Sequence, residues 1–194
     1  MSDVNVNALL YRKIQPGNQY NKLIPQPKGE KVYSGNGDTD FSIKEMVEVV
    51  NDCSWQMEKV AKILQSSSLI DNIDNVKEFI FNHFQYKADE EDQLLRSPSY
   101  AWHIDRQSGI DCKTYSILAS CLLTEMEIIH YIRKIKQPAF APTEWTHVYV
   151  VVPVDQQKGD LNKGYYTIDG TLKEDYEPAF LQASDYFMSL KLFV

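Results

Sequence analysis

The chain has 194 residues, of which 43% are hydrophobic and 12% aromatic, values typical of a globular domain rather than a disordered segment. Its formal net charge of −7 disfavours binding to the phosphate backbone of nucleic acids or to anionic membranes. No apolar run approaches the roughly 18 residues needed to span a bilayer. The N-terminal sequence shows no signal-peptide pattern, so we expect a cytoplasmic protein.

The spacing of cysteine and histidine gives no sign of a metal site. The three cysteines, Cys53, Cys112 and Cys121, are odd in number and form no CxxC pair, which indicates reduced thiols rather than a disulfide framework. The four histidines show none of the short-range pairings with cysteine that structural zinc uses, and the sequence has no Asp-rich calcium loop. We therefore expect neither a metal ion nor a cofactor.

The first 40 residues are polar and rich in Pro, Gly and Asn, without a helical or alternating period. This composition predicts an extended polar arm with turns over residues 1–40, followed by the folded domain over residues 41–194. Such an arm would wrap the domain or bind a partner. An arm lying over a catalytic cleft would make the protein autoinhibited.

Two helices are predicted after the arm. Ser42 and Glu45 have the spacing of a capping box, which predicts that a helix opens at Ser42, and helical character continues through residues 54–65. The second helix covers "DNVKEFIFNHFQY" and presents apolar side chains at steps of three and four residues, namely Ile73, Val76, Ile80 and Phe84. His83 lies on the same face, so we interpret it as a packed core histidine. The acidic segment that follows, residues 87–100, is predicted to be a solvated loop.

The stretch "SGIDCKTYSILASCLL", residues 108–123, predicts a helix that is apolar nearly all round and therefore surrounded by protein, with Asp111 as its N-cap. Cys112 stands in the first turn, where unpaired N–H groups and the helix dipole favour a thiolate. The glycine turn before it would expose the sulfur. Cys121 and Cys53 are interpreted as core cysteines.

Three strands are predicted downstream, over residues 127–135, 147–152 and 164–169. The loop between the last two has the Pro, Asp, Asn and Gly residues of a hairpin connection. Helices followed by an antiparallel sheet define an α+β domain.

The predicted hairpin brings a histidine and an aspartate together. If Val152 pairs with Gly164, His147 faces Asp169 directly on the same side of the sheet. The Cβ atoms of facing residues lie about 4.5–5.5 Å apart, close enough for a carboxylate to hold an imidazole. A slip of one residue would break this arrangement.

Together with Cys112, these residues have the chemistry of a nucleophilic triad. A thiolate attacks a carbonyl carbon, a histidine shares its proton and later protonates the leaving group, and an aspartate fixes the tautomer of the histidine. The oxyanion would be bound by the backbone N–H of Cys112 and one side chain, Gln107 or Trp102, of which Gln107 is preferred. Scattered residues of these types occur in most proteins, and buried cysteines are usually inert, so an inert Cys112 remains the alternative.

Over about residues 73–172 the chain resembles the transglutaminase-like superfamily, a group of papain-like cysteine enzymes. "VKEFIFNHFQY" is similar to the helix before the core of that family, "RQSGIDCKTYSILASCLLTEMEI" to its cysteine helix, and "THVYVVV" and "YYTIDGT" to its histidine and aspartate strands. The resemblance implies a papain-like α+β core in which N-terminal helices and the cysteine helix pack on an antiparallel sheet. It implies Cys112 as nucleophile, His147 as base and Asp169 as orienting group. The family often has tryptophan and an acidic residue where this chain has Tyr149 and Val151.

The resemblance implies a cysteine-nucleophile enzyme that cleaves an amide or peptide bond of a peptide or protein substrate through an acyl-enzyme. Hydrolysis is preferred, because water is always available and no amine-acceptor site is marked in the sequence. The alternatives are a transglutaminase that cross-links proteins by acyl transfer to an amine, and a catalytically silent structural or assembly module. The chain also resembles small bacteriophage and prophage proteins, which implies a virion-associated location and an assembly partner held by the arm.

Overall fold

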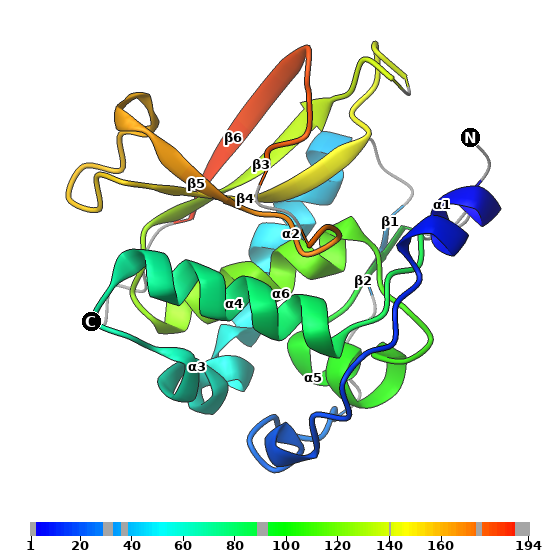
Figure 1. Cartoon of the computed structure of the whole chain (residues 1–194), viewed down its shortest axis with the longest axis vertical. Helices are drawn as coiled ribbons and strands as arrows, with labels where there is room; N and C mark the ends of the chain where they lie inside the picture. Colours follow the sequence, from blue (N-terminus) through cyan, green and yellow to red (C-terminus); the bar gives the residue numbers. More distant parts are fainter. Residues whose placement is uncertain are drawn as a thin grey trace.

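The computed structural model describes residues 3–28, 33–35, 39–88, 93–139, 141–173 and 176–188. Helices gather on one face of a four-stranded antiparallel sheet (Figure 1). This arrangement confirms the predicted α+β class with a cysteine helix packed on the sheet.

The helical elements, including short 3₁₀ turns and one π-helical turn labelled η, are α1 (Asp3–Leu10), η1 (Asn18–Tyr20), α2 (Thr39–Cys53), η2 (Ser54–Met57), α3 (Glu58–Leu64), α4 (Leu69–His83), α5 (Pro98–Tyr100), η3 (Ala101–Asp105), α6 (Cys112–Glu125) and η4 (Leu161–Lys163). The strands are β1 (Tyr33–Gly35), β2 (Gln93–Leu95), β3 (His130–Lys136), β4 (His147–Pro153), β5 (Tyr165–Ile168) and β6 (Gln182–Met188). The short strands β1 and β2 pair with each other, and the other four form the main sheet in the order β5-β4-β3-β6.

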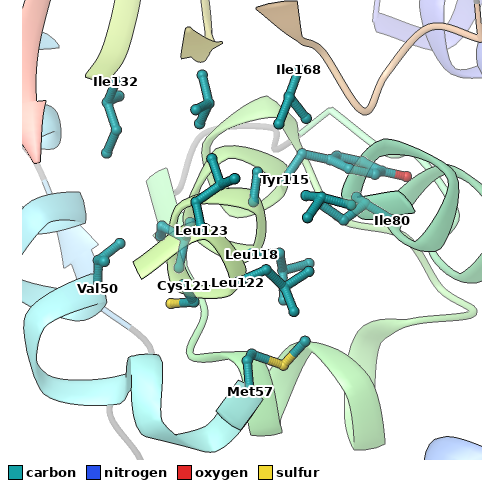
Figure 2. Packing of buried hydrophobic residues seen from close by; sticks show 14 of the residues in the cluster. Val50, Met57, Ile80, Tyr115, Leu118, Cys121, Leu122, Leu123, Ile132 and Ile168 are labelled. Carbon is teal, nitrogen blue, oxygen red and sulfur yellow. The ribbon is translucent and has the colours of Figure 1, made fainter. Parts of the chain in front are cut away.

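Helix α6 lies at the centre of the hydrophobic core. It is buried on nearly every side, between α2, α3 and α4 and the strands β3 and β4. Figure 2 shows Leu118, Leu122 and Leu123 of α6 surrounded by side chains of the other elements. Cys121 also belongs to this core and is fully buried, as predicted, whereas Cys53, also predicted as a core cysteine, is only partly buried against it at the end of α2. The position of α6 fixes the place of its first residue, Cys112.

The register between β4 and β5 differs from the predicted one by two residues. Val152 pairs with Tyr166 rather than with Gly164, and the ladder ends at the pair of Val150 and Ile168. The loop lies one residue further along the chain than predicted, because Pro153 belongs to β4 while Gly164, which has a positive φ of 102° and follows η4, belongs to the loop. Since the shift is an even number of residues, the side chains that point to the same face of the strands are unchanged.

Several local predictions are corrected by the structure. Helix α2 begins at Thr39, so Ser42 lies inside the helix and does not open it. The segment predicted as a solvated loop is only partly one: residues 89–92 lie outside the described residues, but residues 95–99 are buried and lead into α5. His83 is a packed core histidine, as predicted, with 4% of its surface exposed.

The N-terminal segment is not wholly extended, because residues 3–10 form α1. Beyond this helix the segment runs along the side of the domain past α5 (Figure 1) and is tied to it at several points. The Gln15 N–H donates to the Asn82 carbonyl at 2.7 Å, and Ile24 is buried in the core. These contacts show that residues 7–26 pack on the domain, while the domain boundary at residue 40 stays a prediction.

Candidate active site

Cys112 is the first residue of α6, and the residues before it set its position. The Asp111 side chain caps the helix by accepting a hydrogen bond from the Thr114 N–H at 3.1 Å, as predicted, and it also pairs with Lys113. Gly109 has a φ of 116°, and a Cβ atom there would lie 2.4 Å from the Lys87 Cβ. Glycine is therefore required at this turn, for both its backbone conformation and its small size. The turn leaves Cys112 partly exposed.

His147 and Asp169 meet by a diagonal contact. With the observed register, the residue opposite Asp169 would be Tyr149, so the aspartate lies one step along the same face from His147. Diagonal neighbours remain within reach of longer side chains. The imidazole Nε2 and the Asp169 Oδ2 are 2.6 Å apart. The pairing that the sequence suggested is therefore present, although not by direct opposition.

Further contacts orient the side chains of Asp169 and His147. Asp169 Oδ1 accepts hydrogen bonds from the Thr171 N–H at 3.0 Å and from the Thr171 hydroxyl at 2.6 Å. The His147 ring packs against the ring of Tyr149, with 5.7 Å between centroids. Cys112 and His147 line the same cavity, and the proximity of Cys112 contributes to the raised pKa of the imidazole. Because Nε2 is engaged by the carboxylate, Nδ1 is the nitrogen left for the sulfur.

The electrostatics of the pair favour charged side chains. Burial lowers the pKa of His147, but the charge and hydrogen bond of Asp169 and the contact with Cys112 outweigh it and hold this pKa well above 6.5. Burial raises the pKa of Asp169, but His147 and the hydrogen bonds from Thr171 outweigh it and lower this pKa below its ordinary value. The carboxylate is thus prepared to stabilise an imidazolium.

A cavity of about 100 Å³ opens beside the sulfur and the imidazole. It is lined by residues of α2, the start of α6 and the segment that enters β4, namely Ser42, Ile43, Met46, Cys112, Lys113, Trp145, Thr146, His147 and Val148. A larger cavity of about 410 Å³ lies between α4 and β5, but its lining contains no cysteine or histidine. The chemistry of the residues therefore places the candidate site at the smaller cavity.

The two predicted oxyanion donors, Trp102 and Gln107, lie in different environments. Trp102 is in the core, stacked on Phe79, and its indole N–H donates to the Asn21 Oδ1 at 3.0 Å. That donor is therefore engaged by the N-terminal segment rather than by the site. Gln107 is exposed on the turn that follows η3, and its role stays a prediction.

Tyr86 is a neighbour of the site that the sequence reasoning did not single out. It forms an isolated bridge with Ile110, two residues before Cys112, and its ring stacks on Tyr115 at 6.2 Å. Burial and the negative charges of Cys112, Asp111 and Asp169 raise its pKa, which keeps its hydroxyl protonated as a donor. The signal in the sequence was the aromatic residue that ends "NHFQY".

Among the described residues, no group of three or more His, Cys, Asp or Glu side chains is arranged to hold a metal ion. In that same part of the chain, no helix combines the length and apolar character needed to cross a membrane.

Comparison with known proteins gives a family match. Residues 55–186 match the model of a family described as a transglutaminase-like domain. Searches of the curated proteins and of the solved structures found no match.

Proposed function

Because the chain belongs to the transglutaminase-like domain family, a group of papain-like cysteine enzymes, we propose that it cleaves amide or peptide bonds with Cys112 as nucleophile. His147 is the general base and acid in this proposal, and Asp169 is the orienting group. The main support for it is the 2.6 Å contact between His147 Nε2 and Asp169 Oδ2, beside a cavity that His147 and Cys112 line together.

The arrangement supports a two-step reaction. In the first step the Cys112 sulfur, whose proton has passed to His147, attacks the carbonyl carbon, and the C–N bond breaks as the imidazolium gives its proton to the leaving amine. In the second step His147 removes a proton from water, the hydroxide attacks the thioester, and the proton returns to the cysteine as the acid leaves. Asp169 stabilises the imidazolium in both steps.

The oxyanion formed in each step needs hydrogen-bond donors. The Cys112 N–H lies at the start of α6, before the first intrahelical hydrogen bond, and the helix dipole favours negative charge there. The protonated Tyr86 hydroxyl is proposed as a second candidate side-chain donor, beside the exposed Gln107 that the sequence suggested. Removing one such donor costs about 100- to 1,000-fold in kcat in well-studied acyl-transfer enzymes.

The cavity next to Cys112 indicates what the substrate presents there. Its walls are largely apolar, with Ile43, Met46 and Trp145 among the lining residues, and the Lys113 charge is paired with Asp111. A volume of about 100 Å³ is well below that of a whole ligand site, typically 300–1,000 Å³. We expect the cavity to receive one small uncharged side chain next to the bond that is cleaved.

An acyl-trapping experiment tests the proposal. The protein is mixed with p-nitrophenyl esters of small N-acyl amino acids, with and without a fluorescent primary amine, and release of p-nitrophenol and the mass of the Cys112 peptide are followed. We expect a burst of p-nitrophenol, an acyl group on Cys112 and slower turnover by water. Cys112→Ser and His147→Ala should abolish the burst, whereas Cys53→Ser should leave it unchanged, since Cys53 lies at the end of α2.

The same experiment separates the alternatives. Transfer of the acyl group to the amine in preference to water would favour the cross-linking reading. No burst and no acylation of Cys112 with any ester would contradict the proposal and favour a silent module with this fold.

A further inference from the structure

The Arg12 side chain of the N-terminal segment enters the domain beside the residues that carry the candidate site. Its Nη1 donates to the Thr171 carbonyl at 3.1 Å, and its Nη2 donates to the Gly170 carbonyl at 3.0 Å. Gly170 and Thr171 follow Asp169 directly in the sequence, and Thr171 supplies two hydrogen bonds to its carboxylate. Arg12 therefore holds the backbone of the loop on which Asp169 depends.

The same guanidinium also contacts the helix that carries Cys112. Its Nη2 donates to the Tyr115 hydroxyl at 2.6 Å, and that hydroxyl donates to the Phe84 carbonyl at 2.7 Å. Tyr115 lies three residues after Cys112 in α6, about one turn along the helix. The Arg12 guanidinium lies over the ring of Phe81 at 3.9 Å, which fixes the plane of the fork. One side chain thus joins the end of α4, the body of α6 and the Asp169 loop.

We propose that Arg12 is a positioning residue that locks the Asp169 loop against α6, so that the N-terminal segment completes the site rather than covering it. This inference rests on the proposed function for its consequence in catalysis, but the coupling of Arg12 to His147 through Asp169 can be measured without any substrate. This positioning role is the opposite of the autoinhibition expected from an arm that covers the catalytic cleft.

The arrangement of hydrogen-bond acceptors around residue 12 requires the planar, forked guanidinium group of arginine. The acceptors are three backbone carbonyls and one phenol oxygen that lie around a single planar group. A lysine ammonium would retain the charge but would present only a point charge on a flexible stem. A glutamine would lose both the charge and most of the donors. Arg12→Lys and Arg12→Gln therefore separate the effect of the fork from that of the charge.

The first test measures the pH at which the His147 imidazole titrates, followed by NMR in the full-length protein and assigned with His147→Gln. In both Arg12 variants we expect His147 to titrate at a lower pH than in the wild type, in the direction expected for Asp169→Asn. The sign is diagnostic. Removing a nearby cation by itself raises the pKa of an imidazole, so a lower value in Arg12→Gln reports displacement of Asp169 and not the lost charge.

Two internal controls accompany this titration. The His103 Nε2–H donates to the Ile24 carbonyl oxygen, 3.1 Å away, so the His103 signal reports whether the N-terminal segment has detached as a whole. Lys13→Gln removes the same charge from the adjacent, exposed residue and should leave the His147 titration unchanged. If His147 keeps the wild-type midpoint, or moves to a higher one, in a folded Arg12→Gln protein, the proposal is overturned.

The second test measures the rate of Cys112 alkylation by iodoacetamide against pH, with the site of labelling located by mass spectrometry. Small displacements of catalytic groups by remote substitutions can cost about 100-fold. We expect a loss of about 10- to 100-fold at pH 6 in Arg12→Gln, with partial retention in Arg12→Lys. Faster labelling than in the wild type would mean that the segment covers the site and would refute the proposal.

The proposed function and the positioning role of Arg12 fail under different outcomes. If His147→Ala leaves the alkylation profile unchanged, the proposed function fails, while the NMR titration still decides whether Arg12 positions Asp169. If His147→Ala abolishes the reactivity at pH 6 but Arg12→Gln has the wild-type profile in both measurements, only the positioning role fails. If Arg12→Gln does not fold, both measurements are made with Arg12→Lys instead.

Discussion

Replacing Asp169 by asparagine tests the electrostatic reasoning with little change in shape. The Asn Oδ1 can still accept the two hydrogen bonds that Thr171 donates to Asp169 Oδ1. At the other position, an amide N–H₂ donor takes the place of the carboxylate oxygen that lies 2.6 Å from His147 Nε2. The imidazole must then accept at Nε2 and carry its proton on Nδ1, the nitrogen that should receive the proton of Cys112.

The expected magnitude follows from the lost interaction. A hydrogen bond to a charged group contributes about 1.5–3 kcal/mol net, and every 1.4 kcal/mol corresponds to a factor of ten. The imidazolium that pairs with the thiolate is destabilised by this amount. We therefore expect alkylation of Cys112 at pH 6 to fall by about 10- to 100-fold in Asp169→Asn. Turnover, which also needs the correct tautomer, should fall by more, on the order of 10,000-fold as in a serine-protease triad.

The assay is the initial rate of iodoacetamide labelling at Cys112 between pH 5 and pH 9, normalised to the labelling of Cys53 in the same sample. Cys53 is partly exposed and lies outside the site, so it corrects for reagent concentration. Circular dichroism melting confirms that both proteins are folded. An Asp169→Asn protein with the wild-type profile would refute the reasoning, because the carboxylate would then have no influence on the reactive pair.

Three further outcomes are expected. The wild type should be more stable to unfolding than Asp169→Asn, and this difference in free energy should be fully present between about pH 4 and 6.5. At higher pH the difference should fall as His147, whose pKa is raised, loses its proton. At lower pH it should fall as Asp169, whose pKa is lowered, gains a proton. Urea denaturation at several pH values checks this, and a flat difference would contradict it. Gly170→Ala should destabilise the fold by about 1–3 kcal/mol, since the new Cβ would lie 2.6 Å from the Tyr115 Cδ1 and 2.9 Å from the Ile80 Cγ2; an unchanged urea midpoint would show that the loop moves freely. Leu122→Ala, which leaves a cavity at a fully buried position, should cost about 2–5 kcal/mol in the same assay, and a loss below 1 kcal/mol would argue against tight packing around α6.

The sequence was most informative where structure is local. The apolar helix from Cys112, its Asp111 cap and the β-branched strand from His147 each carry their signal within about ten residues, and all three are present. The pairing of His147 with Asp169 could also be predicted, because a two-residue error in register preserves the face to which each side chain points.

What could not be predicted depends on contacts between distant residues. Strand β6 is exposed along much of its length and pairs with β3, about 50 residues earlier, so neither its pattern nor a hairpin turn marks it. Trp102 has the donor of an oxyanion hole, but its ring is drawn into the aromatic core, where Asn21 takes its N–H. Arg12 carried no local signal at all, since its partners are spread over three elements.

The hydrogen bond between Arg12 and the Thr171 carbonyl joins residues 159 positions apart in a chain of 194. During synthesis Arg12 leaves the ribosome long before Gly170 and Thr171, whose carbonyls it contacts, are made. Closing so long a loop is slow compared with forming a helix or a hairpin. If Arg12 positions Asp169 as proposed, Cys112 and His147 reach their final geometry only after Thr171 has been translated, and a nascent chain that ends before Gly170 lacks this contact.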